Sequence, residues 1–186
     1  MRRGGRIPFL LALAGIPLLL GCSIRLTDPE GFPAAARLHD VKPYSQRPEL
    51  CGPYALAAVL NFMEIAADPL EMARRLYVPA AGGTLTMDLY LEASRRGLDA
   101  RQGSGTTQGL VRDLDDGVAP IVLFRYPSLR GSGGHYVVIT GYSMAPDGFF
   151  LLWGDGRLSW MDADRVEGLW SGSEFWYLIL RRKGPW

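Results

Sequence analysis

A cysteine in the segment Cys51-Gly52-Pro53 has the surroundings of a reactive thiol. Apolar residues recur at helical spacing after it, so we expect a helix that begins at or just after Cys51 and runs to about residue 66. Proline is well tolerated in the first turn of a helix, and the unpaired N–H groups there favour a thiolate. Such a position can lower the pKa of a cysteine and make it a nucleophile. The alternative is a small, inert hydrophobic residue of the core.

Three other residues have types and spacings that fit the same chemistry. His135, one of two histidines, begins a run of β-forming residues after a glycine-rich loop, where a rigid backbone would hold it as a general base. Asp155 follows one hairpin later and can orient the imidazole. Gln46 lies five residues before Cys51 in a proline-rich segment, and its amide can donate to an oxyanion. Together the four residues predict acyl transfer through a cysteine nucleophile.

The elements that must position these residues form a helical first half and a β-rich second half. Asp68-Pro69-Leu70-Glu71 has the N-cap, first-turn proline and acidic residue of a helix start. Periodicity and capping signals predict further helices over 68–77, 86–96 and 107–116, and a short one over 162–169. Short runs rich in Val, Ile, Phe, Tyr and Trp predict strands over 119–126, 135–142, 149–153, 157–161 and 174–181. This order indicates an α+β fold with an antiparallel sheet.

The N-terminus has the layout of an exported lipoprotein. Three arginines precede an apolar run over residues 7–20, which is interrupted by prolines and too short to span a bilayer. Leu19-Leu20-Gly21-Cys22 resembles a bacterial lipobox, in which the cysteine becomes the lipid-bearing first residue of the mature chain. We therefore expect a signal peptide over 1–21, lipidation of Cys22 and a tether over 22–42. Ser23 after the cysteine points to the outer membrane, with the domain facing the periplasm.

Composition and charge exclude several classes of protein. Loss of residues 1–21 would remove three of 20 basic residues and leave 17 against 19 acidic ones, so no basic excess is available for nucleic acid. The chain has two cysteines and two histidines, and with Cys22 lipidated it lacks the ligands of an ordinary zinc site. The glycine-rich segments lack the complete motifs of nucleotide-binding loops, so we expect neither metal nor cofactor. The remaining length suits one domain.

The motifs resemble those of the C39 peptidases, which belong to the papain-like cysteine peptidases. The resemblance rests on Gln-x4-Cys-Gly-Pro, on a Gly-His-Tyr-Val-Val-Ile-Thr-Gly strand, and on an Asp followed by Gly-Arg and a helix ending Leu-Trp-Ser-Gly. It implies a papain-like domain over residues 43–186, whose helical half packs on the antiparallel sheet. It also implies four roles: nucleophile for Cys51, oxyanion donor for Gln46, base for His135 and orienting carboxylate for Asp155.

The leading hypothesis is a membrane-anchored cysteine peptidase that acts on a peptide or protein through a Cys-His-Asp triad and an acyl-enzyme. Leu50 and Gly156 depart from the residues common in the family, which motivates a second hypothesis, a binding lipoprotein without catalysis. A third is amidase, transglutaminase or acyltransferase chemistry on the same triad, because a thiolate accepts many acyl groups. The resemblance also implies cleavage after Gly-Gly, although the predicted export sets this chain apart from transporter-fused relatives.

Overall fold

The computed structural model describes residues 31–44, 47–128, 131–154 and 156–184. Within these ranges, no helix is long and apolar enough to cross a membrane. In chain order the elements are β1 (Arg37–Leu38), η1 (Pro48–Leu50), α1 (Cys51–Phe62), α2 (Pro69–Leu76), η2 (Pro79–Ala81), α3 (Thr86–Arg95), β2 (Asp99–Ser104), α4 (Thr107–Asp115), β3 (Ile121–Ser128), β4 (Gly131–Met144), β5 (Asp147–Leu152), β6 (Leu158–Asp162), α5 (Ala163–Ser171) and β7 (Trp176–Arg181).

The helices begin where the capping signals place them. The Asp68 side chain accepts hydrogen bonds from the N–H groups of Leu70 and Glu71 at 2.8 and 2.9 Å, which caps α2 as predicted. Helix α1 begins at Cys51, but it ends at Phe62, four residues earlier than expected. The Asn61 amide explains this end, because it bonds both the N–H and the C=O of Ala67 and so fixes a turn in place of further helix.

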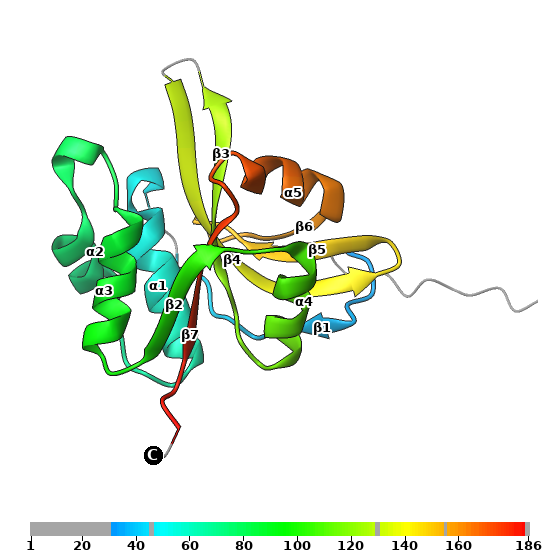
Figure 1. Cartoon of the computed structure of the whole chain (residues 1–186), viewed down its shortest axis with the longest axis horizontal. Helices are drawn as coiled ribbons and strands as arrows, with labels where there is room; N and C mark the ends of the chain where they lie inside the picture. The colour runs from blue at the N-terminus through cyan, green and yellow to red at the C-terminus, as the bar shows by residue number, and fades with distance from the viewer. Residues whose placement is uncertain (1–30, 45–46, 129–130, 155, 185–186) are drawn as a thin grey trace, which may run out of the picture.

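The strands form one antiparallel sheet in the order β2-β7-β3-β4-β5-β6, with β1 paired to β4. The five expected strands are present. The glycine-rich stretch before His135 is not a loop, because β4 runs from Gly131 and pairs Gly133 with Tyr126 of β3. A Cβ on Gly133 would lie 2.8 Å from the Tyr126 ring, so glycine lets that ring lie across the strand. His135 therefore lies inside a long hairpin that projects beyond the other strands (Figure 1).

Helices cover both faces of the sheet, with α1, α2 and α3 on one face and α4 and α5 on the other (Figure 1). Side chains of β4 alternate between the two cores: Tyr136 and Val138 pack with the first, and Val137 and Ile139 with the second. Two buried faces explain why these strands are apolar without a polar alternation. The predicted α+β architecture is confirmed.

Part of the segment expected to be a tether packs against the domain. β1 pairs Arg37 with Tyr142 and Leu38 with Gly141, and the His39 ring lies 2.9 Å from the carbonyl oxygen of Leu114. These contacts join residues far apart in the sequence, so residue composition does not signal them. The signal peptide and Cys22 lie outside the described residues.

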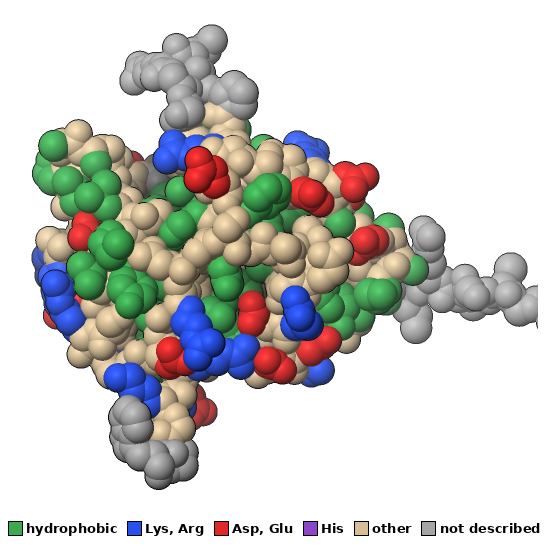
Figure 2. Space-filling model, viewed as in Figure 1, with side chains coloured by type: hydrophobic (Ala, Val, Ile, Leu, Met, Phe, Trp, Pro, Cys, Tyr) green, Lys and Arg blue, Asp and Glu red, His purple; other side chains and the backbone are tan. Residues whose placement is uncertain are grey.

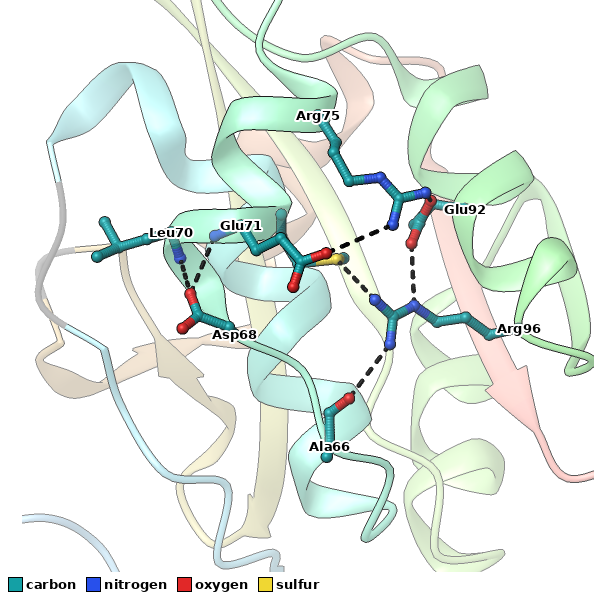
Figure 3. A network of polar contacts seen from close by, with 8 residues as sticks. Ala66, Asp68, Leu70, Glu71, Arg75, Glu92 and Arg96 are labelled. Atoms are coloured by element: carbon teal, nitrogen blue, oxygen red, sulfur yellow. Dashed lines mark hydrogen bonds and ion pairs between the residues drawn. The ribbon is translucent and has the colours of Figure 1, made fainter.

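A buried carboxylate joins α2 to α3 (Figure 3). Glu92 is only 1% exposed and accepts hydrogen bonds from Arg75 at 2.8 Å and from Arg96 at 2.9 Å. Arg96 also donates to the carbonyl of Ala66, so the network reaches the segment between α1 and α2. A buried charge is tolerated only when it is paired in this way. The network therefore holds the helical layer together.

The surface near α3 is unusually apolar. Leu85, Met87 and Leu91 are exposed large hydrophobic residues on α3 or directly before it. In Figure 2 hydrophobic side chains gather over the α2–α3 part of the visible face, whereas acidic and basic side chains are interspersed elsewhere on that face. This apolar surface follows directly after Thr84, which contacts the site described below.

Candidate active site

Cys51 lies at the N-terminus of α1, where η1 leads directly into the helix. It is a free thiol and only 7% exposed. With Tyr44, Tyr54, Trp153 and other neighbours it lines a cavity of about 10 Å³, which holds no more than a water molecule.

The thiol meets the sheet where β5 separates from β4. The last pair between these strands is Val138 with Leu152, after which the N–H of Trp153 donates to Arg157 and the chain turns away. Ile139 donates its N–H to Pro120 on the β3 side of β4. Because N–H groups alternate along a strand, the N–H of Tyr136 points away from β3. It donates to the Cys51 sulfur.

The environment of the sulfur acts on its pKa in two opposite directions. Burial is the largest effect and raises the pKa of the Cys51 thiol above its ordinary value. Hydrogen bonds from the backbone N–H groups of Tyr136, Gly52 and Cys51 itself lower it, and the nearby Glu49 carboxylate raises it. The net pKa is raised, which differs from the lowering expected for a helix start, because burial outweighs the N–H groups. A thiolate here needs a further positive charge.

His135 precedes Tyr136 on β4, and its imidazole is held by the turn that follows β5. The N–H of Gly154 lies 3.3 Å from Nε2 of His135. The Trp153 ring lies beside the imidazole with centroids 5.8 Å apart, and it meets Phe124 edge-on at 5.9 Å. The indole N–H donates to Ser159, which fixes the ring. The orientation of the imidazole is thus set by a packed indole and a backbone N–H.

The structure brings two of the four predicted residues to the same edge of β4. The backbone N–H of Tyr136 contacts the Cys51 sulfur, and His135 directly precedes Tyr136 on β4. The start of α1 and this part of β4 therefore lie side by side. Gln46 and Asp155 lie outside the described residues. Among the described residues, no cluster of three or more His, Cys, Asp or Glu side chains could hold a metal ion.

Sequence reasoning did not identify the contributions of Tyr136, Trp153 and Gly154. Two of these act through backbone N–H groups, which residue type does not reveal. Trp153 carried a signal, because it precedes the Gly-Asp-Gly segment one hairpin after His135. Its position there is typical of an aromatic residue that packs against the imidazole.

Gly52 is required by a close approach at the site. A Cβ there would lie 3.0 Å from the Thr84 Cβ and 3.1 Å from the Tyr136 ring. Gly52→Ala should therefore separate α1 from β4, cost about 1–3 kcal/mol of unfolding free energy and slow alkylation of Cys51. Urea unfolding and iodoacetamide labelling measure both effects. Gly168→Ala in α5 is the control, because its Cβ would meet nothing within 4 Å and helix propensity favours alanine. Equal stability of the two variants would contradict the close approach.

Comparison with solved structures finds the same fold in C39 peptidase domains. A protein from Bacillus anthracis described as a C39-like peptidase is 14% identical, with a TM-score of 0.66 over 82% of this chain and 100% of that one. The peptidase domain of Streptococcus ComA, a bifunctional ABC transporter, is 18% identical, with a TM-score of 0.61 over 77% of this chain and 99% of that one. These likenesses confirm the papain-like architecture.

A third similar structure contains a peptide. It is a double-glycine-motif protease of an AMS/PCAT transporter in complex with a leader peptide, 14% identical, with a TM-score of 0.64 over 80% of this chain and 96% of that one. No curated protein matches the chain. The family model described as "Peptidase_C39 like family" matches residues 38–152, more than half of the chain. The fold agrees with this match, and the chain therefore belongs to the Peptidase_C39-like family.

Proposed function

We propose that the protein is a cysteine peptidase that cleaves peptide bonds through an acyl-enzyme on Cys51. The observation that carries the proposal is the shared cavity, which Cys51 lines together with Tyr136, the residue next to His135, and with Gly154, whose N–H lies 3.3 Å from Nε2 of His135. It juxtaposes the nucleophile and the candidate base at the open edge of β4. The family to which the chain belongs and the solved structures with the same fold are named as peptidases, which supports the proposed activity.

Each residue has one role in the proposed reaction. His135 takes the proton of Cys51, and the resulting thiolate attacks the carbonyl carbon of the scissile bond. The amide of Gln46 stabilises the oxyanion, and Asp155 orients and stabilises the imidazolium. The imidazolium then protonates the leaving amine, and a water molecule, deprotonated by His135, hydrolyses the thioester. Because burial raises the pKa of the thiol, the imidazolium is the charge that keeps the sulfur ionised.

A peptide substrate fits the surface beside the site better than a small amide does. Leu85 and Met87, both exposed, follow Thr84, and Thr84 lies against Gly52. A chain held along this surface would bury apolar side chains, which favours a peptide or protein over a compact substrate. The leader peptide bound by one fold neighbour supports this substrate class.

The decisive experiment compares cleavage of an envelope peptide library by the wild type and by Cys51→Ala. The proposal expects cleavage products that are absent from the variant, with one recurring sequence around the cut. Acyl products formed with added amines instead of water would favour an acyltransferase. A Cys51 thiol that resists iodoacetamide at mildly acidic pH, with no products, would favour the binding lipoprotein.

We further propose that the chain is a lipoprotein anchored through Cys22 to the outer membrane, with the domain facing the periplasm. The support is the lipobox-like segment Leu19-Leu20-Gly21-Cys22. Cys22→Ala should leave an unprocessed or soluble form, because stable anchoring needs more than one acyl chain and none would be attached. Membrane fractionation with gel mobility measures this outcome. Recovery of the variant in the membrane at wild-type mobility would contradict the anchor.

A further inference from the structure

Tyr136 contacts both halves of the site at once. Its side chain is 5% exposed and packs in the core beneath α1, α2 and α3. The hydroxyl donates a 3.0 Å hydrogen bond to the carbonyl oxygen of Thr84, in the segment between η2 and α3. Trp176 of β7 supports the ring edge-on at a centroid distance of 5.6 Å. The phenol is therefore fixed at its tip and along its edge.

The same ring sets where α1 begins relative to β4. It lies against Gly52, the residue after the nucleophile, and Thr84 also lies against Gly52. Three segments meet there: the start of α1, the residues before α3, and β4. A shift of the ring would move Gly52, and Cys51 with it.

The phenol of Tyr136, and not the side chain of Thr84, makes the hydrogen bond that joins β4 to the segment before α3. The Thr84 hydroxyl is buried and has no hydrogen-bond partner within the described part of the chain. The Thr84 carbonyl, by contrast, accepts the bond from Tyr136. A buried hydrogen bond of this kind is costly to leave unmade, because the acceptor would be stranded from water.

We infer that Tyr136 is a positioning residue, whose phenol anchors β4 to the Thr84 carbonyl so that its own N–H and the neighbouring His135 stay in register with the Cys51 sulfur. The inference rests on the proposed function for its effect on turnover. Its effect on the thiol does not depend on that function, because Tyr136 lines the same cavity as Cys51 and its ring lies against Gly52. Displacing a reacting group by about 1 Å can cost up to 10²-fold in rate.

Within the described part of the chain, the charged groups that act on the Cys51 thiol and on the Tyr136 phenol come from several elements. Glu49 on η1 raises the pKa of the Cys51 thiol. Burial is the largest effect on Tyr136 and raises the pKa of its phenol, as do the charges of Cys51 and Asp88, whereas Arg125 on β3 lowers it. The phenol thus stays protonated at neutral pH and remains a donor to Thr84.

The test is Tyr136→Phe, which removes the hydroxyl and keeps the ring. Alkylation of Cys51 against pH should titrate at higher pH than in the wild type, because the N–H and the imidazolium are no longer held against the sulfur. With peptide substrate, kcat should fall about tenfold while KM stays within about twofold, as for loss of orientation rather than binding. Tyr142→Phe is the matched control. Tyr142 lies on the same strand as Tyr136, but its hydroxyl donates to Asp115 of α4 at 3.0 Å, away from the thiol.

The two readouts separate failure of the inference from failure of the proposed function. A thiol titration in Tyr136→Phe equal to that of the wild type and of Tyr142→Phe overturns the inference. A shifted titration without any peptide cleavage by the wild type supports the positioning role and overturns the peptidase proposal. A lowered melting temperature with unshifted titration would make Tyr136 merely structural and also overturns the inference.

Discussion

Cys51→Ala and His135→Ala should each abolish peptide cleavage, and the double variant should be no slower than either single one. We expect losses of about 10⁴-fold or more in kcat/KM, because residues that act as one unit are strongly non-additive. Steady-state kinetics on one peptide substrate measures all three variants. Additive losses would mean that thiol and imidazole act separately.

The second histidine provides the control for this experiment. His39 lies near the opposite end of α1 from Cys51, where its ring packs near Phe62 and its Nε2 lies 2.9 Å from the carbonyl oxygen of Leu114. His39→Gln should therefore retain cleavage. Near wild-type turnover by His135→Ala would refute the proposed mechanism.

Removal of His135 should also change the titration of the thiol. Burial raises the pKa of the Cys51 thiol, and without the imidazolium only backbone N–H groups oppose this effect. The pKa in His135→Ala should therefore lie above that of an ordinary thiol, with less thiolate at neutral pH than in the wild type. Alkylation rate against pH measures the difference, and identical curves would contradict it.

Arg96→Met should be strongly destabilising although it lies away from the site. It leaves the Glu92 carboxylate, which is only 1% exposed, with Arg75 as its remaining cationic partner (Figure 3). Breaking a buried pair from one side costs about 3–5 kcal/mol, and we expect about 3 kcal/mol because Arg96 is itself partly exposed. Urea unfolding at neutral pH measures the loss.

An exposed ion pair is the matched comparison for this prediction. Lys42 and Asp40 lie 2.6 Å apart with side chains 70% and 81% exposed. Lys42→Met should change the unfolding free energy by less than about 1 kcal/mol, because solvent screens such pairs. A loss in Arg96→Met no larger than that would show that Glu92 is solvated in solution.

Local signals predicted the elements well where they depend on neighbouring residues. The Asp68 cap of α2 and the start of α1 at Cys51 are of this kind. Strand β2 was missed, because Asp-Ala-Arg-Gln-Gly-Ser has little β character and forms only through its pairing with β7 at the edge of the sheet. Tertiary pairing also places Gly133 in a strand, where residue type indicated a loop.

Side-chain chemistry singled out the candidate site residues, whereas the backbone contacts around them follow from the fold. Cys51 and His135 are named by their types and motifs, and the structure brings them to one edge of β4. The end of β5 near Leu152 agrees with the predicted strand over 149–153, but the contact of the Tyr136 backbone with the sulfur depends on the packing of α1 on β4, which no local pattern indicates. Burial of Glu92 is equally a tertiary property, since a glutamate on a helix is ordinarily solvated.

The sheet separates two cores, and the proposed reaction draws one group from each. Cys51 belongs to the core beneath α1, α2 and α3, whereas His135 rests on Trp153 and Phe124 of the core on the opposite face. Proteins open locally, in units of unequal stability, before they unfold globally. Opening of either layer would separate the two groups. Loss of turnover on heating therefore reports the opening of the less stable of the two layers. An activity assay can detect this partial opening, whereas spectroscopy averages the signal over the whole chain.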